Sequence, residues 1–187
     1  MESQSLNPTK IATKWAFINL VAQIIITYAF QLLNMDINSP LKYISYVPMI
    51  GCLFLAQKEF RDEQLGGFMT FSQAFSAGFR YAIFSGLLLA VFIYLYYSIL
   101  SPEILSKTLA VSESALEAKG MTSAEIDKAM GMTRKYGPLF FGFGIAIWYG
   151  IGGAVISLVG AAIFKKEKSI NDIEKEANFP DSFDQTV

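Results

Sequence analysis

The sequence contains one stretch that decides its fold, GFGIAIWYGIGGAVISLVGAAIF at residues 142–164. This stretch carries no charged side chain and is long enough to cross a bilayer as a helix. Its small residues recur every three or four positions, which places them on one side of that helix. They are Gly142, Ala146, Gly150, Gly153, Ser157 and Ala161. Small side chains let another backbone approach closely in lipid, so we expect the central helix of a membrane bundle.

The composition excludes several classes of function. The chain has 187 residues, of which 53% are hydrophobic, and a formal net charge of −1. This length suits one domain, and this charge does not indicate nucleic acid as a partner. The sequence has no histidine, the commonest general base and metal ligand, and its only cysteine, Cys52, lies in an apolar block where a thiol is normally inert. We therefore expect no catalytic residue, no metal and no cofactor.

Four apolar segments predict an all-α fold, a four-helix transmembrane bundle. The predicted spans are about 15–34, 41–57, 79–100 and 139–164, within a single domain of residues 1–168. The first apolar run is too long for the core of a signal peptide, and the second contains Pro48 and Gly51, which favour a kink or a tilt. Residues 35–40, MDINSP, predict a turn, and the acidic, polar residues 169–187 are expected to form a disordered tail.

Amide and hydroxyl side chains recur at four-residue steps along the first span, at Asn19, Gln23, Thr27 and Gln31. These groups would be costly against lipid, so the stripe is expected to face protein or water. One interpretation is hydrogen bonding between helices, and the other is a polar pathway, although no ionisable group joins the stripe. We expect the stripe to pack on the small-residue face of the last span. An alternative is that this face mediates the formation of a homo-oligomer.

The junction between the second and third spans combines basic residues, two glycines and a helix start. The residues from Thr70 to Gln73 are typical of a capping box, and the amphipathic pattern that follows predicts an interfacial segment before the third span. Glycines let backbone amides approach a ligand, and a helix N-terminus favours an anion. We therefore hypothesise a lipid-phosphate site formed by Lys58, Arg61, Gly66, Gly67, Thr70 and Arg80. The alternative is a plain structural turn whose cations only set the orientation.

Residues 101–137 form the only sizeable polar region and predict a short extramembrane helical pair. The first helix is expected to start at Ser101-Pro102-Glu103 and to end at Gly120. Glu113 and Glu117 lie four residues apart on it, a spacing that permits metal binding or acid–base chemistry. The alternative is a solvated helix face, which the nearby lysines favour.

The distribution of basic residues predicts an orientation. Four spans place both termini on one side of the membrane, and most basic residues near the span ends fall on that side. They are Lys10, Lys14, Lys58, Arg61, Lys165, Lys166 and Lys168. The positive-inside rule assigns this side to the cytoplasm, so we expect both termini there. Arg134 and Lys135, close to the opposite end of the last span, argue against this orientation.

The same junction resembles a known family. The run KEFRD at residues 58–62, followed by Gly66-Gly67 and Thr70-Phe71, looks like the signature of the domain of unknown function 4199 family. The polar helical insert and the ending from Ser157-Leu158 to Lys165-Lys166 fit the same family, over roughly residues 14–166. The resemblance implies a four-span protein of the bacterial inner (cytoplasmic) membrane without an established activity. It also implies that the gene lies beside genes for glycosyltransferases that act on polyprenyl phosphate.

These observations favour a non-catalytic integral membrane protein, a scaffold or accessory subunit of a membrane complex. The alternative is a binder or carrier of an anionic lipid or polyprenyl phosphate that assists a glycosyltransferase. An enzyme is disfavoured because histidine, a reactive cysteine and metal-ligand spacing are all absent. A transporter is disfavoured because no charged group lies deep in a span. The expected partners are membrane lipid and either a second copy of the chain or another membrane protein.

Overall fold

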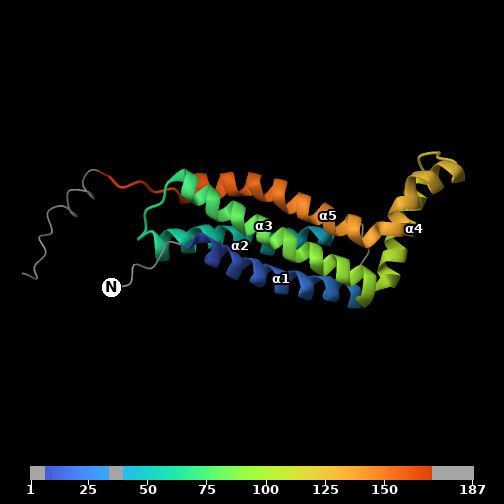
Figure 1. The fold of residues 1–187 in the computed structure, drawn as a ribbon, viewed down its shortest axis with the longest axis horizontal. Coiled ribbons are helices and arrows are strands. Elements are labelled where there is room, and N and C mark those ends of the chain that lie inside the picture. The colour runs from blue at the N-terminus through green and yellow to red at the C-terminus, as the bar shows by residue number, and fades with distance from the viewer. Residues whose placement is uncertain (1–6, 34–39, 170–187) are drawn as a thin grey trace, which may run out of the picture.

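A computed structural model gives the fold and describes residues 7–33 and 40–169. The described residues confirm the all-α prediction. Four helices, α1, α2, α3 and α5, run along the length of the molecule, and α4 crosses one end (Figure 1). The helical segments are α1 Pro8–Leu32, a 3₁₀-helix Pro40–Ser45, α2 Tyr46–Glu59, a π-helix Phe60–Gln64, α3 Phe71–Leu95, a second π-helix Tyr96–Leu100, α4 Pro102–Glu117 and α5 Ser123–Phe164.

Several expectations fall outside the described residues. These are the turn at residues 35–39 and the tail after Ser169. The start of α1 is described, and it lies earlier than the sequence predicted. Asn7 caps the helix by accepting a hydrogen bond from the Lys10 amide at 3.1 Å, and Pro8 follows at a position that needs no intrahelical N–H partner. Lys10 and Lys14 are therefore part of the first helix.

The second apolar segment contains three helix types in succession. Pro48 is the third residue of α2, so its missing N–H removes no intrahelical hydrogen bond. The change from the 3₁₀-helix to α2 occurs just before it, between Ser45 and Tyr46. The proline thus follows a change of helix type at the start of α2.

α3 is one continuous helix whose first turns are the expected interfacial segment, and their place at the membrane interface stays a prediction. The capping box is present, because the Thr70 hydroxyl accepts from the Gln73 amide and the Gln73 side chain accepts from the Thr70 amide. From Phe71 onward the helix continues to Leu95. Its first turns belong to the bundle because their small residues, Ala74, Ala77 and Gly78, are buried.

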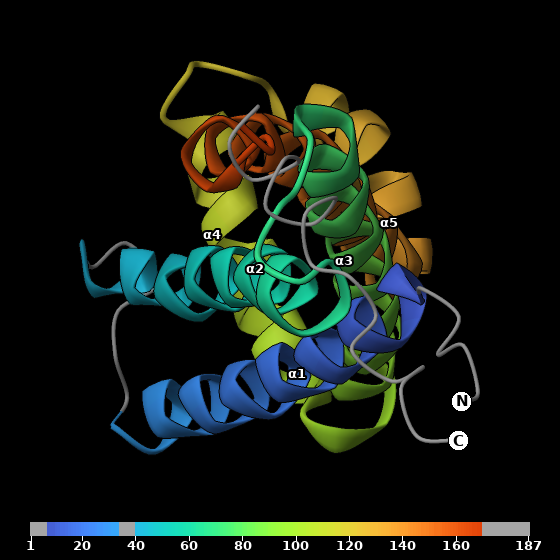
Figure 2. The ribbon, with the colours of Figure 1, turned by 90° about the vertical axis from the view of Figure 1, so that its left-hand side faces the viewer.

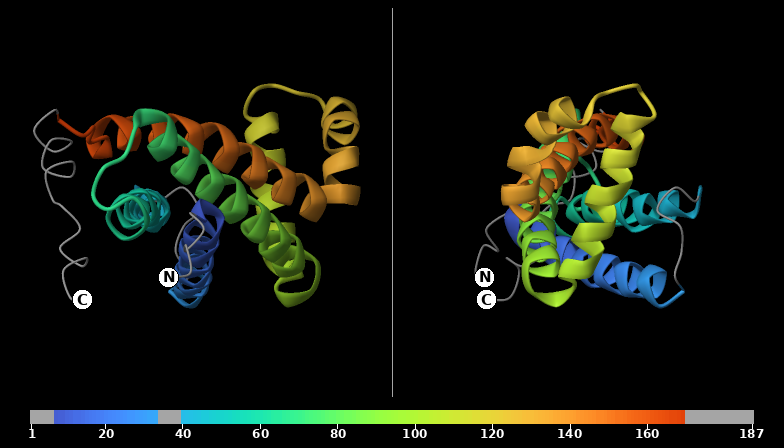
Figure 3. Two further views of the ribbon diagram at one scale, coloured as in Figure 1. Left: turned by 60° about the vertical axis from the view of Figure 1, so that its left-hand side comes forward. Right: turned by 90° about the vertical axis from the view of Figure 1, so that its right-hand side faces the viewer.

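The helical pair expected between residues 101 and 137 is present, and its second helix is continuous with the last span. Gly120, with a φ of +81°, lies between α4 and α5 in the left-handed conformation that glycine adopts readily. α5 has 42 residues and bends at Tyr136, where φ is −122° and ψ is 20°, two positions before Pro138. The bend directs the first turns of α5 away from the bundle, beside α4 (Figure 3).

The small-residue face of α5 packs on α3, and the prediction that it packs on the first helix was wrong. A Cβ added to Gly142 would lie 2.9 Å from the carbonyl oxygen of Ala90, and one added to Gly153 would overlap Ala82. On the opposing helix, a Cβ on Gly86 would lie 2.9 Å from Tyr149. Both helices therefore contribute small residues to a close contact, as expected for helix association in lipid. α1 and α2 lie side by side and are inclined to this pair (Figure 2).

The exterior of the bundle is apolar. Three helices, α1, α3 with its extension to Leu100, and α5, are long and apolar enough to cross a membrane. Large hydrophobic side chains are exposed along all three: Phe17, Val21, Ile25, Leu87, Val91, Ile147, Ile151 and Val155. Soluble monomers rarely expose such extended apolar surface, so this exterior is typical of contact with lipid.

We expect Gly153→Ala and Gly150→Ala to change stability in opposite directions. A Cβ on Gly150 would meet only the Ile83 Cδ1 atom at 3.9 Å, whereas one on Gly153 would overlap Ala82. Overpacking costs about 1–3 kcal/mol, while replacing a helical glycine by alanine gains about 0.5–1 kcal/mol. Thermal unfolding in a mild detergent should show a lower Tm for Gly153→Ala and an equal or higher Tm for Gly150→Ala. An equal Tm decrease in both variants would contradict the close contact of α3 with α5.

Candidate functional site

The centre of the bundle is organised by the side-chain amide of Gln57, which is fully buried. Its Nε2 atom donates one hydrogen bond to the carbonyl oxygen of Ala74 on α3 and one to that of Ser157 on α5, both at 3.0 Å. Gly78 and Gly160 provide the space, because a Cβ on either residue would collide with the Gln57 amide. One side chain from α2 therefore joins three helices at a single point.

The polar stripe of α1 contacts other helices at two levels. Asn19 and Gln23 direct their amide nitrogens at the hydroxyl of Tyr149 on α5, at 3.4 and 3.5 Å, and Gln23 also donates to the Ser45 carbonyl at 2.6 Å. Further along, the Gln31 Oε1 atom accepts from the Tyr96 hydroxyl at 3.0 Å. These contacts match the interpretation of the stripe as hydrogen bonding between helices.

A cleft lies beside the contact of this stripe with Tyr149. It has a volume of about 310 Å³, and α1, the start of α2, α3 and α5 all contribute to it. Its polar lining comes from Gln23, Thr27, Ser45 and Tyr149, while Tyr46 and Trp148 stand among its aromatic residues. It lies in the half of the bundle nearer α4, where α1 and α3 end and α2 begins (Figure 1).

The opposite end of the bundle carries charge. The start of α1, the end of α2, the start of α3 and the end of α5 meet there (Figure 1). Glu59 binds both Lys14 and, at 2.8 Å, the indole nitrogen of Trp15. Met69 and Lys166 exchange two backbone hydrogen bonds of 2.8 Å, which attach the segment before α3 to the end of α5.

The structure brings the predicted lipid-phosphate residues to this charged end, but their cations have other contacts. Arg61 donates to Asp62 at 2.6 Å and stacks on Phe164, with its guanidinium 5.7 Å from the ring centre. This hydrogen bond lowers the pKa of the Asp62 carboxyl below its ordinary value. Arg80 donates to the Thr9 hydroxyl at 3.0 Å, and Lys58 is exposed.

The two glycines of the same junction form its turn. Gly66 and Gly67 have φ values of +64° and +88°, and a Cβ on either would meet no atom within 4 Å. Glycine is therefore needed at both positions for its backbone conformation, because other residues rarely adopt positive φ. Thr70 uses its hydroxyl and its amide in the capping box. In the first turn of α3 the amides of Phe71 and Ser72 are the ones that helix geometry leaves without an intrahelical partner.

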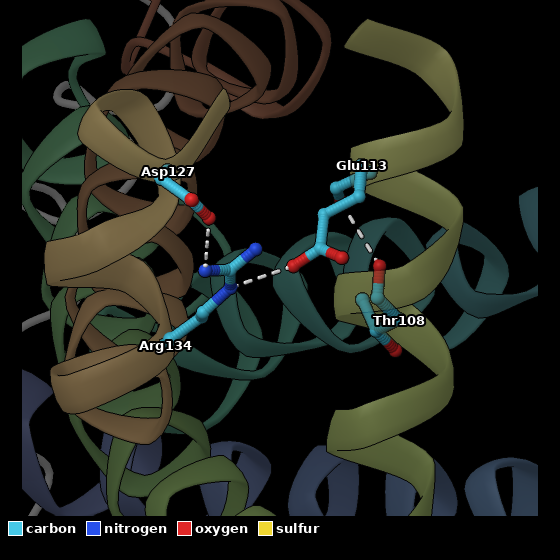
Figure 4. A network of polar contacts seen from close by, with 5 residues as sticks. Thr108, Glu113, Asp127 and Arg134 are labelled. Carbon is cyan, nitrogen blue, oxygen red and sulfur yellow. Dashed lines mark hydrogen bonds and ion pairs between the residues drawn. The ribbon is translucent and has the colours of Figure 1, made fainter. Parts of the chain in front are cut away.

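Outside the bundle, ion pairs attach α4 to α5 (Figure 4). Arg134 donates to Glu113 on α4 and to Asp127 on its own helix, each at 2.8 Å. These hydrogen bonds raise the pKa of the Arg134 guanidinium. Glu117 is exposed and stands one turn further along α4. Glu113 is thus part of an ion pair between helices.

Sequence reasoning missed the two residues that organise the interior. Gln57 closes the second predicted span, residues 41–57, and was given no role of its own. The available signal was that its side chain is uncharged, unlike those of Lys58 and Glu59. Tyr149 lies in the middle of a span, whereas tyrosine is enriched at membrane interfaces, and this unusual depth was a signal for a buried hydrogen bond.

These features define the class of the molecule: an all-helical protein whose long apolar helices and apolar exterior are typical of a membrane protein. The chain belongs to the family described as "Protein of unknown function (DUF4199)", whose model matches residues 14–166. The resemblance of the junction to this family is therefore confirmed. No curated protein and no solved structure matches the chain.

We expect Gln57→Leu to lower the stability of the bundle. The change removes both hydrogen bonds to Ala74 and Ser157 while keeping a side chain of similar size. Amide hydrogen bonds between membrane helices are worth about 0.6–2 kcal/mol each, so the free energy of unfolding should fall by about 1–3 kcal/mol. Denaturation in mixed micelles would measure this, with Leu87→Ala on the exposed face of α3 as the control. Unchanged stability of Gln57→Leu would contradict the central role of the amide.

Proposed function

We propose that the protein crosses the bacterial inner membrane four times. α2 has 14 residues, which are too few to span on their own. The 3₁₀-helix Pro40–Ser45 lengthens it. At about 2.0 Å per residue in a 3₁₀-helix and about 1.5 Å in an α-helix, residues 40–59 reach roughly 33 Å, enough for a hydrocarbon core of about 30 Å. With α2 as a span, the number of crossings is even and both termini lie on one side.

The charges support a cytoplasmic location for both termini. The basic residues of the predicted cytoplasmic side all lie on the helix ends that meet at one end of the molecule (Figure 1). At the other end, Arg134 is paired with Glu113 and Asp127. These carboxylates offset its positive charge, so Arg134 argues less strongly against this orientation. The positive-inside rule then favours the end that carries Lys10, Lys58, Lys165 and Lys166 as the cytoplasmic one.

In this membrane the protein acts as a non-catalytic scaffold or accessory subunit. The observation that carries this proposal is the exposed helical pair of α4 and the first turns of α5, which project beyond the bundle (Figure 3). No residue of α4 is buried. Arg134 holds this pair together through its ion pair with Glu113. A supported helix with an open outer face suits the binding of a second membrane protein.

Single cysteines at Ser114 and Ser169, in a Cys52→Ala background, test location and role together. An impermeant maleimide should label Ser114→Cys in intact spheroplasts and leave Ser169→Cys unlabelled. A photo-crosslinker attached to Ser114→Cys should then capture one membrane protein in stoichiometric amount, because α4 forms the proposed docking face. Labelling of Ser169→Cys would reverse the orientation. Capture of nothing, or only of a second copy of this chain, would overturn the accessory role.

A second candidate function is the binding of an anionic lipid or polyprenyl phosphate at the α2–α3 junction, in support of a glycosyltransferase. The exposed Lys58, the open space around Gly66 and Gly67 and the first amides of α3 favour it. Arg61 can contribute only by exchanging the Asp62 carboxylate for a phosphate.

This competition gives a prediction. Asp62→Asn should tighten the binding of phosphatidylglycerol about two- to fivefold, because an exposed ion pair of this kind is worth about 0.2–1 kcal/mol. Arg61→Gln should weaken it by a similar factor. A lipid titration in nanodiscs would measure both, with Lys107→Gln on α4 as a control that removes one cation at the other end. Equal affinity in all four proteins would leave the junction as a structural turn.

A further inference from the structure

The cleft between the four long helices has the features of a small-molecule site. Its volume of about 310 Å³ lies at the lower end of the range of ligand pockets, about 300–1,000 Å³. Two of its aromatic residues, Tyr46 and Trp148, are 37% and 55% exposed, so the cleft opens toward the lipid-facing side of the bundle. A ligand can therefore enter from the bilayer and leave a chain outside the cleft.

The inner wall of the cleft presents hydrogen-bond donors. Gln23 and Tyr149 line it although each is more than nine-tenths buried. The two amides that point at the Tyr149 hydroxyl are 3.4 and 3.5 Å away, longer than ordinary hydrogen bonds of about 2.7–3.2 Å. The hydroxyl therefore retains its capacity for a shorter bond to a ligand. Behind it, the Oδ1 atom of the fully buried Asn19 has no partner among the described residues.

Among the described residues, those that line the cleft include no acidic and no basic side chain. A phosphate or carboxylate placed there would lose its hydration without gaining a counter-charge, which is unfavourable. The donors suit instead a neutral acceptor such as a carbonyl oxygen. This distinguishes the cleft from the basic α2–α3 junction, where an anion is favoured.

The aromatic residues of the cleft favour a ligand with a flat ring. The rings of Tyr46 and Trp148, which both line the cleft, lie 6.3 Å apart at 55°. Aromatic rings prefer offset or tilted contact with another ring, and Trp148, in the lining and 55% exposed, is accessible for such a contact. The volume accommodates one substituted ring.

We propose that this cleft binds the ring of a quinone that carries an apolar tail. One ring carbonyl accepts a hydrogen bond from the Tyr149 hydroxyl. The ring packs against Trp148, and the tail extends between the lipid-facing sides of α3 and α5. This site is independent of the lipid-phosphate candidate, which lies at the opposite end of the bundle.

The two tryptophans of the chain allow a direct test with decylubiquinone as the probe. Trp148 stands at the cleft, whereas Trp15 lies at the other end, bonded to Glu59. In detergent-solubilised full-length protein, decylubiquinone should quench the fluorescence of the Trp15→Phe variant saturably, because only Trp148 then reports. The Trp148→Phe variant should show only weak, linear quenching. Equal and linear quenching in both variants would mean partition into the micelle and would overturn the proposal.

Two substitutions in the Trp15→Phe background test the contacts. Tyr149→Phe should weaken quinone binding about five- to tenfold, the effect of losing one hydrogen bond. Ile93→Phe reduces the cleft from the α3 side and should abolish saturable quenching, while Ile83→Phe, an exposed position two to three turns away on α3, should not. Thermal unfolding of each variant should show that it is folded. If Ile93→Phe binds as tightly as Ile83→Phe, the cleft is not the quinone site.

A competition experiment separates a quinone from a lipid as the occupant. Excess phosphatidylglycerol should leave the saturable quenching unchanged, because the cleft offers no cation to a phosphate. Displacement of decylubiquinone by this lipid would assign the cleft to membrane lipid and overturn the proposal.

Discussion

The buried amide of Gln57 is the interaction on which the helix arrangement depends. Its two N–H groups bond to carbonyl oxygens of two different helices, so it fixes α2, α3 and α5 relative to one another. In an apolar interior, burying an amide without partners would cost free energy. The two hydrogen bonds therefore favour one arrangement of the helices as well as stabilising it. Gly78 and Gly160 are part of the same constraint, because any larger side chain would occupy the position of the amide.

The polar contacts divide the molecule along its length. Charged groups pair at the two ends, as Lys14 does with Glu59 and Arg134 with Glu113, while the buried polar side chains of the described residues are amides and hydroxyls. This division follows from the cost of burying charge in lipid. It also supports the two proposed binding sites, one for an anion at the basic end and one for a neutral hydrogen-bond acceptor beside Tyr149.

Much of the fold followed from local sequence properties. Apolar length predicted the helices, Thr70 and Gln73 predicted the capping box, and Gly142 and Gly153 predicted a close helix contact. The candidate sites were predicted less well from the sequence. Arg61 was expected to serve a phosphate, but its neighbour Asp62 binds it, and Arg80 binds Thr9, a residue 71 positions away that no local pattern could indicate.

The sequence by itself determined that the chain forms long apolar helices with one face of small residues, because helix formation and amphipathicity depend on neighbours along the chain. Only the tertiary structure decided which helix meets that face. Many pairings of apolar helices are nearly equivalent in lipid, where burial of apolar surface does not discriminate among them. The choice of α3 over α1 depends on where Gln57 finds its two carbonyl oxygens, and the cleft beside Tyr149 exists because α1 and α2 are inclined to the pair so formed.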